Sequence, residues 1–136
     1  MNYRKIARFL LIGLCLTAVA WGREDRLINT GVAPGAEGKV VTSTDRNGNT
    51  EMEIQVKHLA TPEKLTPAKQ AYLVWVQARG KSPELLGILR VNEDLQGSLK
   101  ATTPYKTFDI LVSGEDNLKP EVPSGMVILK GTIERK

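Results

Sequence analysis

The sequence predicts an all-β protein. Short segments rich in β-branched and apolar residues recur along the chain, turn residues separate them at regular intervals, and no helical period lasts longer than one turn. A length of 136 residues accommodates one hydrophobic core. The pattern is typical of an immunoglobulin-like antiparallel β-sandwich of about seven strands, without the cysteine pair of antibody domains.

Residues 1–20 have the build of a secretory signal peptide. A basic beginning is followed by an apolar run of about a dozen residues and by an Ala-x-Ala exit at Ala18-Val19-Ala20. We therefore expect cleavage before Trp21 and export to the periplasm or the extracellular space of a bacterium. The alternative is an uncleaved segment that anchors the chain, but the apolar run is shorter than the ~20 residues that span a bilayer.

Residues 21–37 are polar and contain glycine, and no period of 2 or 3.6 persists in them. This pattern predicts a flexible lead-in, so the sandwich domain is expected over residues 38–136. Its first two strands, 39–44 and 51–57, flank an Asn-Gly turn and form a hairpin. The second of these strands alternates apolar and polar residues, which indicates one buried and one solvated face.

Five more strands are expected after a long loop that contains Pro62 and Pro67 and crosses from one sheet to the other. The segment 71–78 is apolar at nearly every position, as in a central strand covered on both sides. Gly87 in the next strand marks a bulge or a close approach by a neighbouring side chain, for which Trp75 is the candidate. The five strands are 71–78, 85–91, 98–102, 108–113 and 126–134.

The net charge of +4 is concentrated in the targeting segment. Arg4, Lys5 and Arg8 lie there, which leaves 16 basic and 15 acidic residues, a net charge of +1, in the rest of the chain. The apparent basicity is therefore no argument for a nucleic-acid partner, and a membrane contact is expected only through an uncleaved targeting segment. Leu14 precedes Cys15, where lipoprotein processing needs a small residue, so this cysteine is interpreted as part of the apolar run.

Few residues are candidates for chemistry. One cysteine and one histidine exclude a Cys/His zinc site, so no cofactor or metal is expected. His58 is the only imidazole on which a nucleophilic relay could be built, and the chain has no Gly-x-Ser-x-Gly elbow. The Asp45-x-Asn47-Gly48 string is interpreted as a hairpin tip and not a calcium loop. These observations predict a protein without catalytic residues.

Aromatic side chains are the candidates for a binding surface. Tyr72 and Trp75 are three residues apart in one strand and must point to opposite faces, so one of them can lie in the core. Trp75 is interpreted as the core residue in preference to a ligand platform. Tyr105 follows a proline in a turn and is the better candidate for an exposed contact.

The central and C-terminal strands resemble the extracytoplasmic C-terminal domain of anti-sigma-K-type factors. The resemblance rests on Tyr72-Leu73-Val74-Trp75, on Leu86-Gly87-Ile88-Leu89, on 108–112 and on the ending Pro123-Ser124-Gly125 with its apolar strand and Gly131. It covers residues 38–135 and implies an immunoglobulin-like outer domain with a sensing or scaffold role. Members of that family carry a cytoplasmic sigma-binding domain and a transmembrane helix, whereas only a signal peptide is expected here, so their regulatory activity is not transferred.

The sequence therefore predicts an exported, non-catalytic domain that binds another component of the cell envelope, a protein being the expected partner. The alternative is a small-ligand or carbohydrate-binding module that uses Tyr105, Trp75 and the loop 114–125. An enzyme would need a spatial cluster of ionisable groups around His58. The sequence leaves the oligomeric state open.

Overall fold

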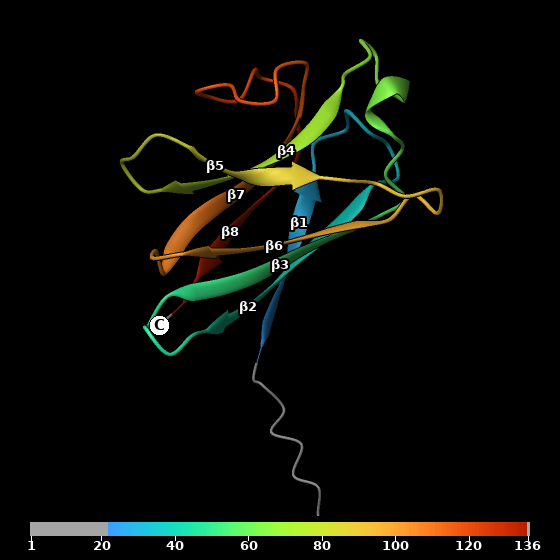
Figure 1. Cartoon of the computed structure of the whole chain (residues 1–136). Helices are drawn as coiled ribbons and strands as arrows, with labels where there is room; N and C mark the ends of the chain where they lie inside the picture. Colours follow the sequence, from blue (N-terminus) through green and yellow to red (C-terminus); the bar gives the residue numbers. More distant parts are fainter. Residues whose placement is uncertain (1–21, 136) are drawn as a thin grey trace, which may run out of the picture.

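A computed structural model describes residues 22–135, in which the chain forms antiparallel β-structure (Figure 1). The strands, in chain order, are β1 (Arg23–Asn29), β2 (Glu37–Thr44), β3 (Thr50–Lys57), β4 (Ala71–Ala78), β5 (Glu84–Leu89), β6 (Gly97–Thr103), β7 (Thr107–Glu115) and β8 (Val127–Glu134). One turn of 3-10 helix, η2 (Pro62–Lys64), lies in the loop that carries the chain from β3 to β4. The expectation of an all-β fold is confirmed.

The eight strands form one sheet in the order β5-β4-β7-β8-β1-β2-β3-β6. Strand β1 joins its two halves, because residues 23–27 pair with β2 whereas Ile28 and Asn29 pair with β8. The sheet curls until its two edge strands, β5 and β6, approach each other, and an isolated bridge joins Val91 to Gly97 there. The result is a nearly closed sheet around one interior.

Strand β1 lies in the segment that the sequence predicts to be an irregular lead-in. That prediction was wrong for residues 23–29, and the folded domain begins at Arg23 instead of near Gly38. Only Leu27 of the seven residues is buried, so the strand has almost no hydrophobic alternation for a sequence pattern to detect. Backbone pairing on both sides holds it in the sheet. The described chain therefore has eight strands, one more than expected.

The predicted hairpin is confirmed. Strands β2 and β3 pair without interruption from Glu37 opposite Lys57 to Thr44 opposite Thr50. Gly48 in the connecting turn has a φ of +81°, a conformation that glycine adopts without steric cost. In β3 the buried residues alternate with exposed ones, as the sequence pattern indicated. Strand β4, apolar at nearly every position, is buried on both faces.

The main core fills the interior of the curled sheet. Its fully buried members come from both halves of the sheet and include Val40, Ile54, Tyr72, Ile110, Val112, Ile128 and Ile133. A second, smaller cluster of Ala71, Leu73 and Trp75 lies on the opposite face of β4 and is flanked by Ile88 and Leu111. Tyr72 and Trp75 thus belong to different clusters, which confirms that they point to opposite faces.

The edge strands β5 and β6 meet across a seam that side chains close. The pairing of β5 with β4 shifts register between Val74 and Trp75, so the bulge expected at this point of β5 is present. The close approach to Gly87 comes from Leu99 of β6, whose Cδ1 would lie 3.3 Å from an added Cβ, and not from Trp75. At Gly97 an added Cβ would lie 2.4 Å from the carbonyl oxygen of Arg90. Glycine at position 97 therefore permits the tight bend between β5 and β6.

The antiparallel connections place several chain segments at one end of the sheet, which we call the basal end. It comprises the start of β1, the end of β8 and the three turns 45–49, 79–83 and 104–106. The longer loops 30–36, 58–70 and 116–126 lie at the opposite end, as Figure 1 shows. Arg23 Nη1 donates a hydrogen bond to the carbonyl oxygen of Glu134, which ties the first strand to the last.

Candidate functional site

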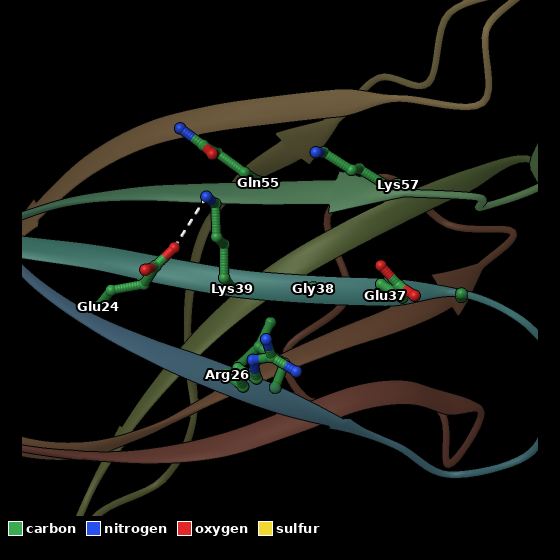
Figure 2. Close-up of a pocket in the computed structure, with 9 residues that line it drawn as sticks. Glu24, Arg26, Glu37, Gly38, Lys39, Gln55 and Lys57 are labelled. Atoms are coloured by element: carbon green, nitrogen blue, oxygen red, sulfur yellow. Dashed lines mark ion pairs between the residues drawn. The ribbon is translucent and has the colours of Figure 1, made fainter.

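A shallow hollow of about 420 Å³ lies on the outer face of β1, β2 and β3 (Figure 2). Side chains from all three strands line it, and most of them are charged or carry an amide: Glu24, Arg26, Glu37, Lys39, Gln55 and Lys57. Leu27, Ala36 and Gly38 complete the lining. We call these nine residues the outer-face hollow. It is the site that the geometry of the described residues favours for recognition.

The period of the strands explains why these residues share one face. Successive side chains of a strand point to opposite sides, so Lys39 faces outward while its neighbour Val40 is buried in the core. Register then brings the outward residues together: Arg26 pairs with Lys39, Lys39 with Gln55, and Glu37 with Lys57. Side chains of directly opposite residues are about 4.5–5.5 Å apart at Cβ, close enough to interact. The hollow is therefore built on the paired backbone of three neighbouring strands.

The electrostatics of the outer-face hollow are mixed in sign. Lys39 Nζ lies 2.8 Å from Glu24 Oε1, and this hydrogen bond and charge lower the pKa of the Glu24 carboxyl below its ordinary value. Within residues 22–135, Arg26 and Lys57 form no ion pair or side-chain hydrogen bond. Their charges are thus available to a partner, beside the carboxylate of Glu37. A surface of this kind suits recognition by ion pairs and hydrogen bonds.

Two of the three aromatic residues that the sequence offers as a binding surface are buried. The Tyr72 side chain lies in the main core, and its hydroxyl donates a 2.6 Å hydrogen bond to the carbonyl oxygen of Ala60. Burial, with a contribution from the charge of Glu63, raises the pKa of Tyr72 to about 12. Trp75 is 1% exposed, and its Nε1 donates a 2.8 Å hydrogen bond to Ser113 Oγ. In this structure neither ring offers a face for stacking.

Tyr105 is half-buried and lies apart from the other two aromatic residues, at the basal end. Its hydroxyl donates a 2.6 Å hydrogen bond to Glu84 Oε1 at the start of β5, and this bond raises the pKa of Tyr105 above its ordinary value. Lys81 Nζ lies 4.9 Å from the centre of the ring, a cation–π contact. The three side chains fasten the turn before β7 to the start of β5, so Tyr105 helps to close the seam.

The other residues that the sequence offers as candidates for chemistry either accept hydrogen bonds from the backbone or lie apart from one another. Asp45 Oδ1 accepts hydrogen bonds from the backbone N–H groups of Asn47 and Asn49, both at 2.8 Å, as expected of a hairpin tip. Glu115 is buried and its carboxylate accepts the N–H of Ser124. His58 is exposed at the end of β3, with a φ of 55°. Over residues 22–135 no group of three or more metal-ligating side chains occurs.

The outer-face hollow was not predicted from the sequence. Three of its charged residues, Glu24, Arg26 and Glu37, belong to the segment 21–37 that the sequence assigns to a lead-in, so the pairing of Glu24 and Arg26 with β2 was missed. Alternation in β3 did indicate that Gln55 and Lys57 face water. The alternation could not reveal β1, the third strand, whose side chains complete the hollow.

Comparisons with known proteins found no matching family model, no matching curated protein and no matching solved structure. No helix within residues 22–135 has the length and apolar character needed to cross a membrane. The expected signal peptide, residues 1–20, lies outside the described residues.

Proposed function

We propose that the protein is an exported, non-catalytic binding module of the bacterial cell envelope, which recognises a protein partner through the outer-face hollow. The observation that supports this most is the hollow itself. Three paired strands hold charged side chains on one open face, and the side chains of Arg26 and Lys57 form no ion pair within residues 22–135. A surface presented on a rigid scaffold binds without losing much conformational freedom, which favours specific recognition.

Export is part of the same proposal. It is supported by the basic beginning, apolar run and Ala-x-Ala exit of residues 1–20, and an uncleaved anchoring segment remains its alternative. We also propose that the fold is of the immunoglobulin-like sandwich type. Two halves of the sheet that share β1 and enclose one core support that assignment. The resemblance of residues 38–135 to the outer domain of anti-sigma-K-type factors supports a sensing or scaffold role.

A protein partner is favoured over a small ligand or a carbohydrate by the kind of surface. The outer-face hollow is shallow and carries both signs of charge, as polar protein interfaces do. A carbohydrate module would need exposed aromatic rings, and of Tyr105 and Trp75 only Tyr105 is partly accessible in this structure. The ligand-binding alternative therefore depends on Tyr105 and the loop 114–125.

Charge reversal tests the proposal. Arg26→Glu and Lys57→Glu, combined in the full chain and expressed in the native host, are expected to abolish the cross-linked product that the wild-type protein forms with its envelope partner. Lys64→Glu with Lys119→Glu is the matched control, because both lysines are exposed in loops and the net charge changes equally. Loss of the product in both double variants, or in neither, would argue against recognition through the outer-face hollow.

A further inference from the structure

A second hollow, of about 920 Å³, lies at the basal end and is unusually rich in arginine. Its lining consists of Arg23, Arg79, Thr107, Glu134 and Arg135. The residues come from the start of β1, the residue that follows β4, the start of β7 and the end of β8, four segments that only the fold brings together. We call these five residues the basal arginine hollow. Three guanidinium groups thus share one open cavity with a single carboxylate.

The three guanidinium groups differ in how many hydrogen bonds and ion pairs they form within the described residues. Arg23 is committed to the protein, since its Nε lies 3.3 Å from Asp25 Oδ2 and its Nη1 donates to the backbone of Glu134. Arg135 Nη2 donates to Thr44 Oγ1 at 3.0 Å, but its buried Nη1 has no hydrogen-bond partner within residues 22–135. Arg79 is exposed, and within the same residues it forms no ion pair or hydrogen bond.

This pattern points to an acceptor that comes from outside the described chain. A guanidinium carries five N–H donors and no acceptor, and leaving a buried donor unpaired destabilises the protein. Glu134, whose Cα is the register partner of Thr107, is the only carboxylate in the lining. Because Asp25 already pairs with Arg23, the three guanidinium groups keep a surplus of one positive charge over the carboxylates of Asp25 and Glu134. Planar guanidinium forks bind carboxylates and phosphates in a bidentate manner, which lysine cannot do.

We infer that the basal arginine hollow is a binding site for a phosphate-class oxyanion. Arg79, which is exposed, provides the accessible donors, Arg135 adds its charge and an unpaired Nη1, Thr107 adds a hydroxyl, and Arg23 forms part of the lining. The anion can be free phosphate or the phosphate of a lipid headgroup. Because Gly22 leads directly into β1 at this end, the chain enters the domain beside the hollow, where an anchored form would hold it near a membrane surface.

The inference is independent of the proposed protein-binding function, because the two hollows share no residue. The test measures the binding of inorganic phosphate to the full chain by isothermal titration calorimetry, and co-sedimentation with vesicles of phosphatidylglycerol or phosphatidylcholine. Arg79→Gln removes the freest guanidinium from an exposed position. Arg90→Gln is the matched control, since Arg90 is also exposed but lies at the opposite end, in the turn between β5 and β6.

Arg79→Gln is expected to weaken binding about tenfold to a hundredfold, the value of one charged hydrogen bond or ion pair, and Arg90→Gln is expected to leave it unchanged. Glu134→Gln is expected to strengthen binding, because it removes the repelling carboxylate, a gain that mere structural damage cannot produce. Saturable phosphate binding, with the affinities of the variants in this order, identifies a free anion as a ligand. Sedimentation with phosphatidylglycerol vesicles alone, with the same order, identifies a lipid headgroup. No binding to either probe, or equal losses for Arg79→Gln and Arg90→Gln, would overturn the inference.

Discussion

The hydrogen bond between Trp75 and Ser113 provides the most direct test of the interpretation that Trp75 is a structural residue and no ligand platform. Both side chains are buried, with exposures of 1% and 0%, and Ser113 Oγ accepts the indole N–H at 2.8 Å. Ser113→Ala removes one small oxygen and leaves the indole donor unpaired in the second core cluster. The expected loss is about 1–3 kcal/mol of the free energy of unfolding, the cost of an unsatisfied buried polar group.

Urea unfolding followed by circular dichroism measures this loss, because it does not depend on the fluorescence of the tryptophan in question. For a domain of this size, the expected loss corresponds to a fall in melting temperature of roughly 4 °C for each kcal/mol. Ser98→Ala is the matched control, since Ser98 is exposed on β6, and its effect should stay within about 0.5 kcal/mol.

A double-mutant cycle separates the hydrogen bond from packing. Trp75→Phe also leaves a buried polar group unpaired, this time the hydroxyl of Ser113. In the double variant both partners are gone, so its destabilisation should be about 1 kcal/mol less than the sum of the two single effects. A Ser113→Ala variant as stable as Ser98→Ala, together with additive effects in the cycle, would refute the reasoning.

Three further predictions concern the core and the seam. Because burial raises the pKa of Tyr72 to about 12 from an ordinary value near 10, stability is fully present below pH 10 and is lost as the pH rises towards 12. In Tyr72→Phe, the free energy of unfolding measured by urea titration should fall by roughly 2–3 kcal/mol less over this pH range than in the wild type. A fall equal to that of the wild type would contradict the assignment of the raised pKa to Tyr72. Gly97→Ala should lower the free energy of unfolding by about 1–3 kcal/mol, because the added Cβ would collide with the carbonyl oxygen of Arg90. A melting temperature equal to that of the wild type would exclude the collision. Tyr105→Phe should speed amide hydrogen exchange in β5, since it removes the hydrogen bond from the Tyr105 hydroxyl to Glu84. Exchange at wild-type rates would show that this hydrogen bond does not stabilise the contact between the edge strands.

The sequence was informative where side-chain alternation is strong. Strand β3 buries every second residue and β4 is apolar at every position except Gln77, so both were predicted with nearly their observed bounds. Gly87 was interpreted as a bulge for a sound reason, because a glycine inside a strand marks irregular pairing. The side chain that approaches it, Leu99, belongs to a strand that is not adjacent in the sheet order, which a linear pattern cannot show.

The sequence was least informative where backbone pairing replaces hydrophobic burial. Strand β1 buries only Leu27, yet it occupies the middle of the sheet because both of its edges are paired. Both candidate sites depend on that strand, through Arg26 in the outer-face hollow and Arg23 in the basal arginine hollow. Because the sequence pattern did not reveal β1, neither site could be predicted. The aromatic residues were then the only visible candidates, and two of them, Tyr72 and Trp75, serve the core.

The central proposal is that an envelope protein binds the outer-face hollow, and site-specific photo-cross-linking in the native host tests it most directly. A photoreactive amino acid is placed at Gln55, inside the hollow, and at Lys119, in a loop at the end of the sheet opposite the basal end. The proposal predicts one discrete cross-linked species from position 55, absent from position 119 and lost when Arg26→Glu and Lys57→Glu are added. No species from position 55, or the same species from both positions, would contradict it.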